Sequence, residues 1–250
     1  MRSLFKNFII IIIIIIIWQL IVSVFNIAEY VFPGPIGVLQ IAIERANDIL
    51  DAATITTIEA ISGLLIAIII TTIISLFFML YPSLEKLLSN FLIALQSTPI
   101  MAIAPLLTLW FGTGIGSKIA SACIVCFFPM LSGWLSGIKS VSYEEKDLFK
   151  IMNATKTQTI YYLIIPRSLP FFFSSLKISA PLSFVGAIVG EFVGASSGIG
   201  FQILSSSYYV KTKDMFCFVI VASFLGILFY KLVVLLENKL LFWHGSIQKK

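Results

Sequence analysis

Long apolar runs dominate this chain, and short polar connections separate them. An apolar run of about 20 residues crosses a bilayer as a helix, because hydrocarbon offers no partners for unpaired backbone groups. The nine isoleucines Ile9–Ile17 are therefore expected to be helical despite their β-branched side chains. The alternation typical of membrane barrel strands is absent. Hydropathy predicts six spans, at about residues 8–25, 55–80, 89–111, 119–138, 169–192 and 215–236.

The connection between the first two spans combines a turn with an amphipathic stretch. Phe32-Pro33-Gly34-Pro35 predicts the turn. Residues 37–51 then mix apolar and charged side chains, which predicts a short helix. Two interpretations stay open. The helix lies on the outer membrane surface, or it is a plain connector packed against other spans.

Charge adds an orientation to these spans. Only 12% of the residues are charged, against about 25% in ordinary soluble domains. With the N-terminus in the cytoplasm, Arg45, Lys118, Lys211 and Lys213 lie outside. The inner side carries the larger set Arg2, Lys6, Lys86, Lys139, Lys146, Lys150, Lys156, Arg167, Lys239, Lys249 and Lys250. This bias follows the positive-inside rule. The net charge of +5 therefore indicates topology, with both termini cytoplasmic, and no nucleic-acid surface is expected.

The cytoplasmic loop 139–168 is the longest and most charged connection, and its first half predicts a helix. Ser142 and Glu145 have the capping-box spacing, in which the two side chains satisfy each other's backbone N–H groups. The helix is expected to run to about Met152. Asn153 tolerates the left-handed conformation that ends helices.

The second half of the loop repeats this pattern. Thr155 and Gln158 again have the capping-box spacing and predict a second short helix. Pro166 and Pro170 are expected to close the loop and begin the fifth span. A folded helix–turn–helix on the cytoplasmic face is well placed to dock a partner protein. The alternative is a loop that packs only against its own bundle.

Small and ionisable residues mark candidate positions within the spans. Gly186, Gly190 and Gly194 share one helix face and predict close helix packing; the segment up to Gly200 is then a flexible outer loop. Ionisable groups in a membrane are functional candidates by default. Such groups here are Glu59, Lys177 and Glu191, with an interfacial position near water as the alternative for the two acids and snorkelling to the inner face for the lysine.

Catalytic chemistry has no visible site in the sequence. Cys123 and Cys126 form a C-x-x-C within an apolar span, where two buried small side chains are the expected interpretation. His244 is the single histidine. The glycines of residues 112–118 fit neither nucleotide-binding fingerprint. No catalytic residue, metal or cofactor is therefore expected, and any ATP is bound by another chain.

The loop residues resemble the signature of binding-protein-dependent ABC importer permeases, which reads E-A-A, three residues, G, nine residues and I-x-L-P. Anchored on Pro166, Asp147 stands at the glutamate position and Asn153 at the glycine position. Leu148 and Phe149 replace the two alanines. Aspartate keeps the carboxylate, and asparagine can still adopt the turn.

Other motifs resemble the nitrate, sulfonate and taurine branch of this family. They are Thr98–Gly112, Cys126-Phe-Phe-Pro129 and Gly186–Gly200, together with the Phe32–Leu39 turn, so the resemblance covers about residues 30–240. Glu59 before Gly63, together with the Gln96-Ser-Thr-Pro99 and Leu176-Lys-Ile178 segments, looks most like members linked to thiamine-precursor pyrimidine uptake.

The resemblance implies an all-α, MetI-like permease fold that fills residues 1–250 as one transmembrane domain and acts as a pair of copies. It implies cytoplasmic ATPase subunits on the loop and a substrate-binding protein outside. The implied coupling residues are Asp147, Lys150, Asn153, Ala154, Thr155 and Pro166; the candidate pathway residues are Glu59, Lys177, Gly186, Gly190 and Glu191. The competing classes are a membrane enzyme and a channel or ion-gradient-driven secondary transporter, and the latter should show inverted repeats or a central acidic cluster.

Overall fold

The computed structural model describes residues 2–241, without the side chains of residues 2–8, 11, 89, 90, 93 and 95, and these residues form helices without any strand. The predicted all-α fold is confirmed. The helices are α1 (Arg2–Val24), α2 (Pro35–Glu44), α3 (Ala46–Leu80), α4 (Pro82–Ser97), α5 (Ile100–Phe111), α6 (Ile115–Lys139), α7 (Tyr143–Ile151), α8 (Lys156–Thr159), the π-helix η1 (Ile160–Ile164), α9 (Ile165–Glu191), α10 (Ile199–Tyr208) and α11 (Thr212–Leu240).

Four helices of the described chain are long and apolar enough to cross a membrane. They are α3, α6, α11 and the continuous helix Lys156–Glu191 that joins α8, η1 and α9. With 35 residues, α3 is about 52 Å long and exceeds the roughly 30 Å hydrocarbon core. The first predicted span corresponds to α1.

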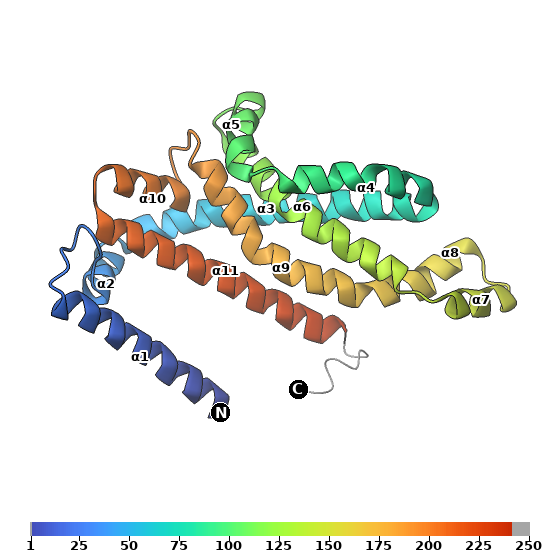
Figure 1. Ribbon diagram of the computed structural model, residues 1–250, viewed down its shortest axis with the longest axis horizontal. Coiled ribbons are helices and arrows are strands. Elements are labelled where there is room, and N and C mark those ends of the chain that lie inside the picture. The colour runs from blue at the N-terminus through green and yellow to red at the C-terminus, as the bar shows by residue number, and fades with distance from the viewer. Residues whose placement is uncertain (1, 242–250) are drawn as a thin grey trace.

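The third predicted span is not one helix. The chain leaves the helical conformation at the end of α4 and begins again as α5, which turns away from α4 (Figure 1). Pro99 has an extended backbone, with φ −59° and ψ 126°, and it precedes the first helical residue of α5. A proline also disfavours the helical conformation of the residue before it. The prediction of a continuous helix over 89–111 was therefore wrong.

Helix α6 forms the centre of the bundle and packs along both α9 and α3. Glycines allow this approach. A Cβ added at Gly186 would lie 2.6 Å from the Cα of Ala122, and one at Gly63 would lie 2.5 Å from the Cβ of the same residue. Small residues matter at such contacts because lipid supplies no hydrophobic drive for helix association. The glycine face of α9 therefore packs against a helix of its own chain.

The two ends of the bundle differ. Figure 1 shows α7 and α8 at one end and α2 and α10 at the other. Helix α2 packs against α11, with Val38 buried beside Phe218. It ends at Glu44, and residues 46–51 already belong to α3. Of the two interpretations of residues 37–51, the packed connector matches the structure, and the predicted single helix over that range is divided at Arg45.

Arg45 joins three elements at this end. Its guanidinium donates to Asp214 of α11, and its Nε lies 2.9 Å from a carboxylate oxygen of Asp48. Burial lowers the pKa of Arg45, but the hydrogen bonds and charges of the two aspartates outweigh this effect and raise the pKa above its ordinary value. The joint between α2 and α3 is therefore held by ionic contacts to α11.

Candidate functional site

Both ends of α7 have the geometry that the sequence predicts, with a capping box at the start and a sharp turn after the end. Ser142 Oγ accepts from the Glu145 N–H at 3.2 Å, and the Ser142 N–H donates to Glu145 Oε2 at 3.0 Å. Asn153 has a φ of 54°. Its N–H donates to the Lys150 carbonyl at 2.9 Å, and the Ala154 N–H donates to the Phe149 carbonyl at 3.0 Å. These bonds satisfy carbonyl groups at the end of the helix and confirm the predicted sharp turn.

The second capping box also forms, but the helix behind it continues into the membrane. The Thr155 N–H donates to Gln158 Oε1 at 2.8 Å, and the Gln158 N–H donates to Thr155 Oγ1 at 3.2 Å. A separate second helix closed by Pro166 was a wrong prediction, since the helix runs unbroken from Lys156 to Glu191. The wider turn of η1 directly precedes Pro166, where a proline removes a backbone donor.

One face of α7 is tied to the bundle. Arg167 at the start of α9 lies 2.7 Å from Glu145. Phe149 packs against a buried apolar cluster around Leu163 and Ile164. Glu145 and Phe149 therefore attach α7 to the first part of the long helix Lys156–Glu191.

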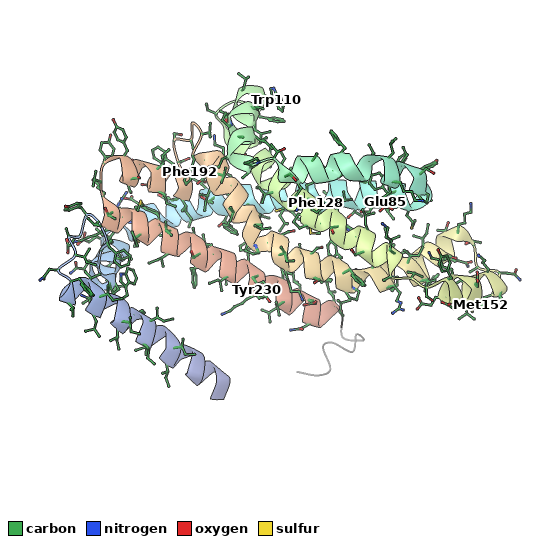
Figure 2. All side chains as sticks on the ribbon, in the orientation of Figure 1. Glu85, Trp110, Phe128, Met152, Phe192 and Tyr230 are labelled. Atoms are coloured by element: carbon green, nitrogen blue, oxygen red, sulfur yellow. The ribbon has the colours of Figure 1, made fainter. Side chains whose placement is uncertain are left out.

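The other face of α7 carries exposed apolar side chains. Tyr143 is 84% exposed and Ile151 is 79% exposed, with Leu148 and Met152 also exposed. Figure 2 shows Met152 at the far end of the molecule, beyond the membrane-spanning helices. These apolar side chains are not covered by any other part of the described chain.

Charged groups surround this apolar face. Asp147 and Lys150 form an exposed ion pair of 2.8 Å along α7. Hydrogen bonds from its own backbone N–H and from the Ser142 hydroxyl lower the pKa of Glu144, which keeps a negative charge at the start of the helix. Of the predicted coupling residues, Asp147, Lys150, Asn153 and Thr155 are exposed, whereas Ala154 and Pro166 are partly covered.

The two acids among the predicted pathway residues are enclosed within the chain. Glu191 is 1% exposed, whereas one interpretation of the sequence placed it near water. Thr56 Oγ1 donates to one of its oxygens at 2.6 Å, and the Gly200 N–H donates to the other. Glu59 is 4% exposed beside it. The flexible loop predicted before Gly200 is instead closed against this carboxylate, and α10 begins at Ile199.

Two lysines have different surroundings from those that the sequence predicted. Lys118 was placed in an outer loop, but it is buried at the start of α6 and donates to the Thr113 carbonyl. Lys177 lies 2.8 Å from Glu237 of α11 and forms an ion pair there. Sequence reasoning missed both Glu237 and Thr56. The only sequence signal for Glu237 was that it is an acidic residue close to an apolar run. Thr56 gave no signal, because nothing in its neighbouring residues marks it.

Comparison with known proteins identifies the family. The model of the binding-protein-dependent transport system inner membrane component matches residues 78–241, which include the α7 turn and the helix that follows it. This chain belongs to that family. Its members are the membrane permeases of ABC importers for small solutes, and the family works with ATPase and substrate-binding partners. The channel or secondary-transporter alternative is therefore set aside.

Several curated relatives carry solute names. A formylaminopyrimidine transport permease of Halalkalibacterium halodurans is 33% identical over 229 residues, covering 91% of each chain. A riboflavin transport system permease of Chloroflexus aurantiacus is 33% identical over 163 residues, or 65% of this chain and 61% of the relative. A putative aliphatic sulfonates transport permease of Bacillus subtilis is 28% identical, with 94% and 86% covered.

Proposed function

We propose that two copies of this chain form the membrane pathway of an ABC importer and that an ATPase subunit binds the exposed face of α7. The observation that carries this proposal is the two-sided character of α7. One side is fastened to α9 through Glu145 and Arg167, and the other presents Ile151 and its apolar neighbours to water. A partner bound to the outer side would therefore pull directly on a membrane-spanning helix.

The ATP would be bound and hydrolysed on that partner, which places the α7 end in the cytoplasm. The basic residues support this orientation. Lys139, Lys146, Lys150 and Lys156 lie at or near α7, whereas Arg45, Lys211 and Lys213 lie at the end that holds α2 and α10. By the positive-inside rule, this distribution supports a cytoplasmic position for both ends of the chain. The substrate-binding protein would dock at the α2 and α10 end.

The break between α4 and α5 supports a second copy. Glu85 in the first turn of α4 pairs with Lys139 at the α7 end of the bundle. Ser97 follows twelve residues later, about 18 Å further along the helix, which is within the hydrocarbon thickness. Non-helical backbone at that depth occurs only where protein or a water-filled cavity covers it. Residues 97–99 are exposed in the single chain, so a second copy or the pathway would cover them.

The predicted pathway residues would then act through helix packing. Gly186 and Gly190 allow α9 to lie against α6, Lys177 joins α9 to α11, and Glu191 joins α9 to α10. Each fixes how the continuous helix Lys156–Glu191 transmits a displacement of α7. Contact with the solute would belong to the exposed residues at the break between α4 and α5.

The proposed solute is a formylaminopyrimidine or a similar small polar heterocycle. The support is the 33% identity to a formylaminopyrimidine permease over nine-tenths of both chains. The resemblance of the Glu59 and Gln96 segments to pyrimidine-linked members points to the same class. The relatives named for riboflavin and aliphatic sulfonates supply the competing solutes for a transport assay.

Docking can be tested by charging the exposed face of α7. Ile151→Asp should reduce co-purification of the ATPase subunit at least tenfold, because the carboxylate would be buried without a partner in the contact. Tyr208→Asp is the matched control, since Tyr208 is equally exposed but lies on α10 at the other end. Normal ATPase binding by Ile151→Asp, or equal loss in both variants, would contradict the proposed contact and the orientation with it.

A further inference from the structure

A pair of carboxyl groups is buried where α3, α6, α9 and the start of α10 meet. Glu59 of α3 and Glu191 of α9 are each more than nine-tenths buried, and Thr56, one turn before Glu59 on α3, donates to the Glu191 carboxylate. Glu59 Oε2 has no hydrogen-bond partner among the described residues. A buried carboxylate oxygen without a hydrogen-bond donor destabilises the fold, and protonation of the carboxyl group lowers this cost.

The hydrogen-bond donors around Glu191 favour its ionised form over that of Glu59. Thr56 donates to its Oε1, and the N–H of Gly200 donates to its Oε2. Thr56 also accepts the N–H of Ile199 at 2.9 Å, so these two side chains together cap the first turn of α10. Negative charge is favoured at a helix N-terminus, where free backbone N–H groups point outward.

The surrounding charges do not balance two ionised acids. Lys118 of α6 is the charged side chain that acts on both carboxyls, and it is 2% exposed. Its ammonium already donates to the Thr113 carbonyl. One cation beside two carboxylates would leave a net buried negative charge, which is strongly unfavourable without compensation. Protonation of one of the two carboxyls would remove this excess charge.

We propose that Glu59 and Glu191 bind one proton at neutral pH, that Glu59 carries it, and that its O–H donates to Glu191. With Thr56 three residues earlier on α3, Glu59 then gives Glu191 a second donor from the same helix face. The proton fastens the start of α10, together with the loop behind Gly194, to α3 and α9. This site goes beyond the transport function and does not depend on it.

Infrared spectroscopy of the purified chain in lipid tests the proton directly. A protonated carboxyl has a carbonyl band separate from that of carboxylates, and the native chain should show one such band at pH 7. Glu59→Gln should remove it, whereas Asp214→Asn, which alters a carboxylate already paired with Arg45, should leave it unchanged. A native spectrum without this band, or a band that survives in Glu59→Gln, would overturn the proposal.

Thermal unfolding distinguishes which acid carries the proton. Glu59→Gln should melt within a few degrees of the native chain, because its amide N–H can still donate to Glu191. Glu191→Gln should melt clearly lower, since its amide group would face the donors of Thr56 or Gly200. Thr56→Val should also lower the melting temperature, and Thr54→Val, an exposed threonine two residues earlier, is its control. The reverse order for the two glutamates would reject Glu59 as the proton carrier.

Discussion

The absence of a side chain at Gly190 allows α9 to pack closely against α6. An added Cβ would lie 2.9 Å from the Cα of Lys118 and 3.0 Å from the hydroxyl of Ser121, so α6 leaves no room for it. The shared face of the α9 glycines was visible in the sequence because helical spacing alone defines it. The helix that covers this face was not, because α7 and the two connections on either side of it separate α6 from the helix that contains α9.

Gly190→Leu should separate α6 from α9 at a cost typical of overpacking, roughly 1–3 kcal/mol. It should abolish solute uptake while membrane insertion continues, and Gly190→Ala should have a smaller effect on both uptake and melting temperature. Uptake normalised to membrane protein level is the measurement. Gly116→Leu is the control, since the nearest atom to an added Cβ there is 3.8 Å away. Full transport by Gly190→Leu would remove the glycine contact from the mechanism.

Among the elements, those set by neighbouring residues matched the sequence best. Both capping boxes and the left-handed Asn153 follow from residues within three or four positions of each other, and all of them form. The break at Pro99 carried a local signal that hydropathy overrode, since the apolar run continues through it. The contacts of Glu191 with Thr56 and Gly200 had no local signal, because Thr56 is 135 positions away.

The turn after α7 should be intolerant of proline. Asn153→Pro requires a φ near −65°, against the observed 54°, and it removes the N–H that donates to Lys150. The substitution should disorder the end of α7 and lower ATPase association, while Asn153→Gly should be nearly neutral because glycine adopts this conformation freely. Co-purification from membranes measures both variants. Equal ATPase binding by Asn153→Pro and the native chain would show that the turn geometry is not used.

At the scale of the whole molecule, one continuous helix connects the two ends of the bundle. It begins beside α7, passes α6 and α11, and ends at Glu191, where α10 is attached. A displacement of α7 by a bound ATPase would therefore reach the opposite membrane surface through a single rigid element. The sequence indicated both ends of this path but placed a break at Pro166, because proline there is a typical start of a helix.

The most direct test is solute uptake into vesicles that hold this chain, its ATPase and its substrate-binding protein, with labelled formylaminopyrimidine as the first solute. Riboflavin and an aliphatic sulfonate are the comparison solutes. We predict uptake that requires ATP on the ATPase side and the binding protein on the other, and that is insensitive to collapse of ion gradients. Uptake that follows an ion gradient without ATP, or no ATP-dependent uptake of any of the three solutes, would contradict the account.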